Sequence, residues 1–166
     1  MENKKTTRAL QWIVDILENS DIPYQIEGGL AAICYGSTRE LADIDIFIPN
    51  SGFAKIAEAV KEYSQFGPDY HVGSHWKLIY QILNYHGQQI ELCDADSAEY
   101  LNTKNNVWIK RDIDFNKAEC ISEFGIKIKV IPMFDLIEYK GRLGRDIDQI
   151  DIEQIDKPVS KNYNTK

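Results

Sequence analysis

Two aspartates, Asp43 and Asp45, stand one residue apart in the apolar stretch "ADIDIFIP". Side chains alternate between the two faces of a β-strand, so both carboxylates would point the same way, with Cα atoms roughly 6.6 Å apart. The isoleucines among them would take the opposite, buried face. Parallel carboxylates repel each other, and a divalent cation such as Mg²⁺ or Mn²⁺ removes that conflict. The spacing favours a metal site, and a solvated edge strand with two aspartates is the alternative.

A pair of glycines, Gly28 and Gly29, precedes this strand and lies between an expected short strand and an expected short apolar helix. Backbone N–H groups in such a turn can approach and cradle the oxygens of a phosphate. A plain tight turn is the alternative. Ser37 and Thr38 follow the short helix, and either they touch the same phosphate or they are ordinary loop residues.

The glycine pair, the short helix and the Asp-x-Asp strand, in this order and spacing, resemble the nucleotidyltransferase superfamily of the DNA polymerase β type. The stretch from Glu27 to Pro49 is especially similar to the lincosamide-type and AbiEii-like branches, which carry an arginine shortly before the strand. Arg39 stands at that place. The resemblance implies that the paired acids bind two metal ions and that a third carboxylate comes from a later strand.

The third carboxylate implied by this resemblance is expected at Glu91, which stands between Ile90 and Leu92 in an apolar strand pattern. Asp94 and Asp96 are nearby but lie at the strand end, where turn aspartates are common. The superfamily more often has an aspartate at this place, and a glutamate on the rim of the site is the alternative. The candidate catalytic and metal-binding residues are therefore Asp43, Asp45 and Glu91.

The segment 133–155 is similar to the ending of AbiEii-like and related minimal nucleotidyltransferases. Lys140 and Arg145 match basic positions of that ending, and Asp148 and Asp151 match acidic ones. A lysine and an arginine facing the carboxylates would hold a triphosphate and offset its charge. For Lys140 and Arg142 a solvated helix face is the alternative, and Asp148 would also suit the positive end of a helix dipole.

Hydrophobic periodicity and turn residues predict an α+β (α/β) single domain, in which helices flank a mixed sheet. A turn is expected at Gly67 and Pro68, and hairpins are expected at His86–Gly87 and Phe124–Gly125. We expect the domain to span 1–156 and the polar tail 157–166 to be flexible. Helices are expected over 6–20 (capped by Thr6 or Thr7), 29–36, 51–64, 133–144 and 146–155, and strands over 22–29, 42–49, 76–85, 87–94 and 125–132.

Composition narrows the class of protein. The 166 residues carry a formal net charge of −7, which argues against non-specific binding to DNA but not against a structured RNA on a local basic patch. No apolar run approaches the roughly 20 residues of a membrane span, and no signal peptide is visible. Three scattered cysteines without a CxxC pair indicate neither a zinc site nor a disulfide framework, so a reducing, cytoplasmic setting is expected.

The resemblance implies transfer of a nucleoside monophosphate from ATP or another nucleoside triphosphate to an acceptor hydroxyl, with release of pyrophosphate. The acceptor would be a small molecule, an RNA end such as that of tRNA, or a protein. A catalytically inactive module that binds a nucleotide or a partner, and a toxin of a toxin–antitoxin pair, are alternatives within the same fold. The residues expected to bind the nucleotide are Gly28, Gly29, Ser37, Arg39 and Lys140.

Overall fold

The computed structural model describes residues 4–155, which form five α-helices around a nine-stranded mixed sheet. The α+β fold with a mixed sheet is therefore confirmed, while the expected tail 157–166 lies outside the described residues. The helices are α1 (Lys4–Asn19), α2 (Gly28–Cys34), α3 (Asn50–Val60), α4 (Met133–Leu143) and α5 (Asp146–Ile155). The strands are β1 (Gln25–Ile26), β2 (Asp43–Ile48), β3 (Ser64–Val72), β4 (Trp76–Tyr85), β5 (Gln88–Asp94), β6 (Glu99–Asn102), β7 (Val107–Lys110), β8 (Glu119–Glu123) and β9 (Ile126–Val130).

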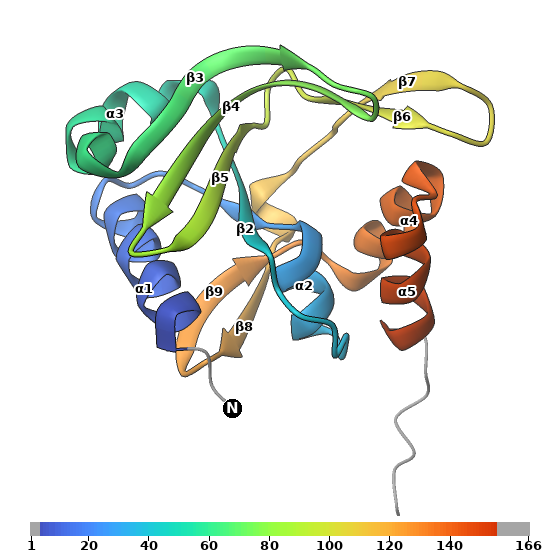
Figure 1. Cartoon of the computed structure of the whole chain (residues 1–166), viewed down its shortest axis with the longest axis horizontal. Helices are drawn as coiled ribbons and strands as arrows, with labels where there is room; N and C mark the ends of the chain where they lie inside the picture. Colours follow the sequence, from blue (N-terminus) through green and yellow to red (C-terminus); the bar gives the residue numbers. More distant parts are fainter. Residues whose placement is uncertain (1–3, 156–166) are drawn as a thin grey trace, which may run out of the picture.

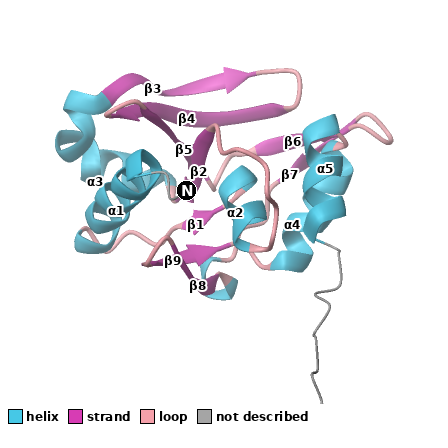
Figure 2. Cartoon of the chain, turned by 60° about the horizontal axis from the view of Figure 1, so that its bottom comes forward, coloured by secondary structure: helices cyan, strands magenta, loops and turns pink. Residues whose placement is uncertain are grey.

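The sheet runs in the order β7-β6-β4-β5-β2-β1-β9-β8, with β3 paired to β4. Helices α1 and α3 lie together at one end of the molecule, and α4 and α5 lie at the other, close to α2 and to the β6–β7 hairpin (Figures 1 and 2). Strand β2 is central, antiparallel to β1 and parallel to β5. None of the helices described is long and apolar enough to cross a bilayer.

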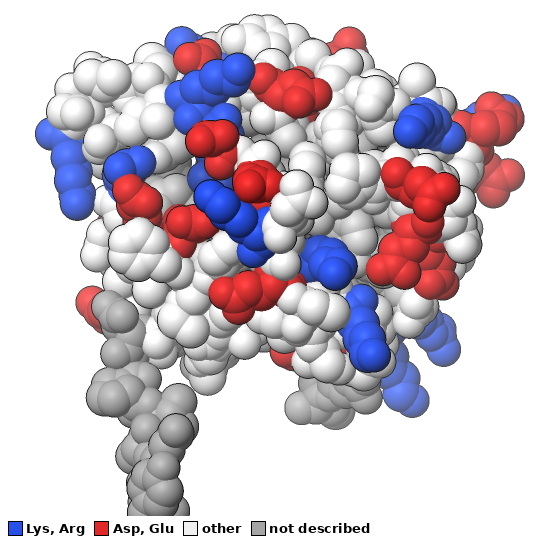
Figure 3. Space-filling view, turned by 180° about the vertical axis from the view of Figure 1, so that it is seen from behind, with Lys and Arg blue, Asp and Glu red and all other residues white. Residues whose placement is uncertain are grey.

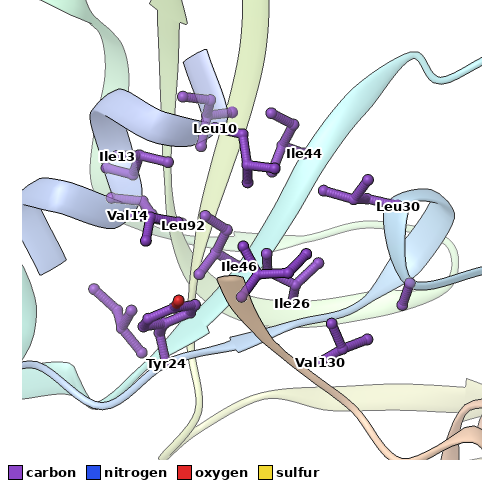
Figure 4. Packing of buried hydrophobic residues seen from close by; sticks show 14 of the residues in the cluster. Leu10, Ile13, Val14, Tyr24, Ile26, Leu30, Ile44, Ile46, Leu92 and Val130 are labelled. Atoms are coloured by element: carbon purple, nitrogen blue, oxygen red, sulfur yellow. The ribbon is translucent and has the colours of Figure 1, made fainter. Parts of the chain in front are cut away.

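Alternation along β2 separates the core from the site. Ile44, Ile46 and Ile48 are fully buried in the main core, where α1 covers them with residues such as Leu10 and Ile13 (Figure 4). Burying each such side chain stabilises the fold by roughly 1.5–3 kcal/mol. A slip of one residue in register would expose all three isoleucines. The core therefore fixes which face of β2 carries the aspartates.

The α4–α5 corner is set by Gly144, which takes a left-handed conformation with φ of 62° and caps α4 through an N–H bond of 2.9 Å to the carbonyl of Lys140. Glycine adopts this conformation without a steric penalty, so it commonly ends helices. The expected end of this helix at Gly144 is confirmed. The tight corner folds α5 back along α4.

Two local expectations, about a helix cap and a turn, were wrong, and one hairpin was not predicted. Helix α1 begins at Lys4, so Thr6 lies inside it, and its hydroxyl donates to Gln88 Oε1 at 2.7 Å instead of capping the helix. Gly67 and Pro68 lie within β3, where the pairing register with β4 shifts, and they form an irregularity in the ladder instead of a turn. The β6–β7 hairpin was not predicted, because each strand has only four residues.

Candidate active site

The three predicted acids converge because β2 and β5 are parallel neighbours. Asp45 is the register partner of Glu91, and Asp43 is that of Gln89. Residues paired in register on adjacent strands project to the same face, about 4.8 Å apart. One carboxylate oxygen from each of Asp43, Asp45 and Glu91 lies within 4.8 Å of the others. The structure thus brings all three sequence-predicted acids to one point.

The electrostatics of this cluster fit a bound cation. Burial, and then the charges of Asp43 and Glu91, raise the pKa of Asp45 to about 8. Burial and Asp43 also raise the pKa of Glu91, against a hydrogen bond of 2.8 Å from Gln89. A group of partly buried oxygen ligands whose charges oppose one another is stabilised by a divalent ion, and Mg²⁺ or Mn²⁺ prefers such ligands. Asp43, Asp45 and Glu91 are the residues that would hold it.

Gly28 and Gly29, the first two residues of α2 and named the glycine turn below, pack directly against these acids. Gly28 has φ of +60°, and a Cβ atom there would lie 1.9 Å from Asp45 Oδ2. A Cβ atom at Gly29 would lie 2.4 Å from Nη2 of Arg39. The Gly28 N–H group donates to the hydroxyl of Tyr139 at 3.2 Å. Gly28 is therefore required by its left-handed backbone and by the approach of Asp45, whereas a side chain at Gly29 would displace the end of the Arg39 side chain.

These residues line a cleft of about 480 Å³. Such a volume lies within the usual range for sites that bind small molecules. Aromatic and apolar side chains form much of the rest of the lining. They include Phe47, Trp76, Leu78, Tyr80 and Tyr139, and His71 stands beside them. The lining of the cleft thus combines charged residues with a group of aromatic residues, the aromatic wall.

Lys140 lines the cleft but is almost fully buried, with its ammonium group 3.1 Å from Asp148 Oδ1 and 2.9 Å from Asp151 Oδ2. Arg39 Nε lies 2.7 Å from Asp151 Oδ1, and Arg145 Nε lies 2.8 Å from Asp148 Oδ2. The resulting network holds three cations and two carboxylates beside the acidic cluster. Arg39, Lys140 and Arg145 therefore present net positive charge at this wall of the cleft.

Ser37 is placed differently from the other predicted residues. It is buried, and its hydroxyl lies 3.0 Å from Asp151 Oδ1 and 2.9 Å from Gln154 Oε1. It is not among the residues that line the cleft. The structure therefore joins Ser37 to α5 and does not bring it together with the acids and glycines.

A buried ion pair next to the glycine turn was not predicted from the sequence. Glu27, directly before the glycines, pairs with Arg111, which stands in the irregular segment after β7. Glu27 lines the cleft, and Arg111 lines a second cavity of about 270 Å³. Tyr139 borders both cavities. The two partners are 84 positions apart in the sequence, which explains why local patterns did not reveal the pair.

The surface also bears on the class of ligand. On the face seen in Figure 3, basic side chains are interspersed with acidic ones and do not form a continuous basic surface. The absence of non-specific binding to DNA, which the net charge of −7 leads us to expect, stays a prediction.

No family profile matches the sequence, and no curated protein matches it. Solved structures do match. TM1012 from Thermotoga maritima, which carries an assignment as a nucleotidyltransferase, superposes with a TM-score of 0.72 at 21% identity over 92% of this chain and 93% of its own. The lincosamide antibiotic adenylyltransferase LnuA, solved with lincomycin, has a TM-score of 0.61 at 15% identity, over 90% and 96%.

A third similar structure is ANT(2")-Ia in complex with adenylyl-2"-tobramycin, with a TM-score of 0.57 at 13% identity over 90% of this chain and 87% of its own. The similarity thus extends over nearly the whole length of each protein. At these identities it reports on the backbone arrangement. The chain therefore shares the fold of these three proteins.

Proposed function

We propose that this protein is a metal-dependent nucleotidyltransferase, which moves a nucleoside monophosphate from a nucleoside triphosphate to an acceptor hydroxyl. The observation that carries the proposal is the convergence of Asp43, Asp45 and Glu91 within 4.8 Å, in a cleft that also contains the glycine turn. The fold shared with two adenylyltransferases supports it. In the reaction an oxygen of the acceptor bonds to the α-phosphorus, the bond to the β-phosphate oxygen breaks, and pyrophosphate leaves.

In this proposal the three acids have different roles. Asp43 and Asp45 bind the cation, and Glu91 helps to hold it or accepts the proton of the acceptor hydroxyl. A divalent ion bound here lowers the pKa of that hydroxyl and offsets negative charge on the phosphates.

In this proposal the phosphates of the nucleotide lie beside the glycine turn and the basic side chains of the cleft. Gly28 and Gly29 have no side chains, so a phosphate can approach the backbone of the turn closely. Arg39 and Arg145 supply guanidinium groups at the cleft, with side chains 18% and 38% exposed. Lys140 is held between two carboxylates, so its contribution is positive potential near Asp45. Ser37 has no place in this arrangement.

The aromatic wall is the proposed site of the base or of the acceptor ring. Aromatic faces stack on planar rings of either kind. LnuA and ANT(2")-Ia were solved with an antibiotic or its adenylylated form, so hydroxylated small molecules are the first acceptors to test. An RNA end and a protein side chain are the others.

The test is label transfer. The purified protein is incubated with each α-³²P-labelled nucleoside triphosphate, Mg²⁺ or Mn²⁺, and an acceptor panel of lincomycin, tobramycin, bulk tRNA and cell extract. We expect one acceptor class to become labelled with an equal amount of pyrophosphate released. The Asp43→Ala/Asp45→Ala double variant should lose this signal, while the surface control Asp15→Ala keeps it. Metal-independent nucleotide binding, unchanged in the double variant and without transfer, would instead establish a non-catalytic module.

A further inference from the structure

The Glu27–Arg111 ion pair is desolvated and is surrounded by aromatic rings. The side chains are 1% and 9% exposed, respectively. The guanidinium carbon of Arg111 lies 4.5 Å from the ring centroid of Tyr139, and the rings of Phe47 and Tyr100 lie within 6 Å. Glu27 Oε1 also accepts a hydrogen bond of 2.8 Å from Gln25 Nε2. The pair therefore bridges the start of α2 and the segment after β7.

Stability alone is a poor explanation for this pair. Taking two charges out of water costs about as much as their attraction returns, and well-packed apolar residues often replace such pairs without loss. Here Glu27 Oε2 and Arg111 Nε are buried and have no hydrogen-bond partner among the described residues. Burying polar atoms without hydrogen-bond partners costs free energy that an apolar side chain of similar size would not cost. Its position supplies a better reason.

The pair contacts the active site from two sides. On one side the backbone N–H of Glu27 donates to the carbonyl of Asp45 at 3.0 Å, and Gly28 follows directly in the chain. On the other side Arg111 lies against the ring of Tyr139, whose hydroxyl accepts the N–H of Gly28. A shift of either charged partner would move the glycine turn relative to the carboxylates.

We propose that Glu27 and Arg111 form a positioning pair, which holds the Gly28 turn and Tyr139 in register with Asp45 so that the acids and the phosphate seat face the same metal-bound nucleotide. This proposal rests on the proposed function. Neither residue needs to touch the nucleotide. Outer residues that orient metal-binding groups typically affect metal affinity by about 10- to 100-fold.

The test compares stability with affinity for Mn²⁺ and ATP, measured by calorimetry on the full chain. Arg111→Met leaves the Glu27 carboxylate buried without its partner, so both stability and affinity should fall. Glu27→Gln/Arg111→Met removes both charges. We expect the double variant to recover stability while its affinity for ATP with Mn²⁺ remains about 10- to 100-fold weaker than that of the wild type. Arg142→Met is the matched control, because Arg142 bonds to Tyr100 at 3.1 Å from the exposed side.

Chemical rescue gives a second measurement. Arg111→Ala opens a space that connects with the second cavity, so added methylguanidinium can take the place of the lost group. It should restore the affinity of Arg111→Ala but not that of Glu27→Gln/Arg111→Ala, which lacks the carboxylate. If both methionine variants fail to fold, the affinity for ATP with Mn²⁺ is measured on Arg111→Lys instead. Lysine keeps the positive charge but lacks the planar guanidinium group.

The outcomes separate the two proposals. Wild-type affinity for ATP with Mn²⁺ in the double variant would overturn the positioning pair and leave the proposed function intact. A wild-type protein that binds ATP no better with Mn²⁺ than without it would overturn both. Equal rescue of the single and double alanine variants would also contradict the positioning pair.

Discussion

Asp45 on β2 and Glu91 on β5 are register partners, so the acidic cluster is a consequence of how two parallel strands align. The alignment is fixed on the other face of the sheet, where Ile44, Ile46, Ile90 and Leu92 are completely buried. The same hydrophobic pattern that makes the core therefore places the carboxylates. It also places them close enough to repel each other, which has measurable consequences.

The first prediction is that Asp45→Asn stabilises the metal-free protein at neutral pH. The pKa of Asp45 is raised to about 8 in the folded state, from an ordinary value near 4. A raised pKa means that Asp45 stabilises the fold below about pH 4 and that this contribution is lost as the pH rises to about 8. Removing the charge should raise Tm at pH 8 by at least about 2–4 °C, the shift that about 1 kcal/mol produces.

Thermal unfolding at pH 6 and pH 8, with and without Mg²⁺, measures this effect. The wild type should gain stability from Mg²⁺ at pH 8, and Asp45→Asn should gain little. Asp15→Asn, on the exposed face of α1, provides a control for the substitution itself. A lower Tm for metal-free Asp45→Asn than for the wild type at pH 8 would contradict the repulsion inferred here.

The second prediction concerns the glycine turn. Gly28→Ala forces a side chain into left-handed backbone, at about 1–3 kcal/mol of strain, and also drives its Cβ atom into the Asp45 carboxylate. Gly125 has φ of +76°, and a Cβ atom there would meet nothing within 4 Å, so Gly125→Ala reproduces the strain without the collision. Gly28→Ala should lose at least as much stability as Gly125→Ala, and only Gly28→Ala should lose binding of Mn²⁺ in a calorimetric titration. Unchanged Mn²⁺ binding by Gly28→Ala would show that Asp45 is free to move.

The sequence was most informative where local pattern and tertiary structure agree. Alternation in 43–48 and around Glu91 separated the buried isoleucine and leucine side chains from the acids, and Gly144 marked the end of α4. The burial of Phe47 and Cys93, on the same face as the acids, was not predicted. Local sequence patterns do not predict contacts between segments that are far apart in the chain. The pairing of Arg111 with Glu27 and the bonding of Ser37 to Asp151 depend on how loops and helices pack, and no short-range spacing encodes them.

The third prediction is that Arg39→Gln weakens nucleotide binding more than it weakens the fold. Its guanidinium lies against Gly29 and has an exposed portion at the cleft. Losing a charge-assisted bond of about 1.5–3 kcal/mol to a phosphate would lower the affinity for ATP with Mg²⁺ by about 10- to 100-fold. Arg142→Gln, which does not line the cleft, is the control. Equal affinities for the two variants would remove Arg39 from the proposed phosphate site.

The fourth prediction is that Lys140 holds the α4–α5 pair together. Burial opposes ionisation of Asp148 and Asp151, but hydrogen bonds from Arg145 to Asp148 and from Arg39 to Asp151, together with Lys140, lower the pKa of both. Their contribution to stability is therefore present above about pH 4 and is lost as the pH falls through the lower folded values. Lys140→Met removes one of the groups that lower these folded pKa values, so the acid-induced loss should be smaller and should be complete at a higher pH than in the wild type.

Urea unfolding at pH 7 should show a loss of about 3–5 kcal/mol for Lys140→Met, the usual result of breaking a buried ion pair from one side. Lys61→Met is the matched control, because Lys61 forms an ion pair of 2.8 Å with Glu58 on the surface, where both side chains are largely exposed. Such pairs contribute about 0–1 kcal/mol. Equal losses in the two variants would mean that Lys140 does not hold Asp148 and Asp151 together. Its positive charge would then be available to a phosphate in the cleft, as the sequence alone predicts.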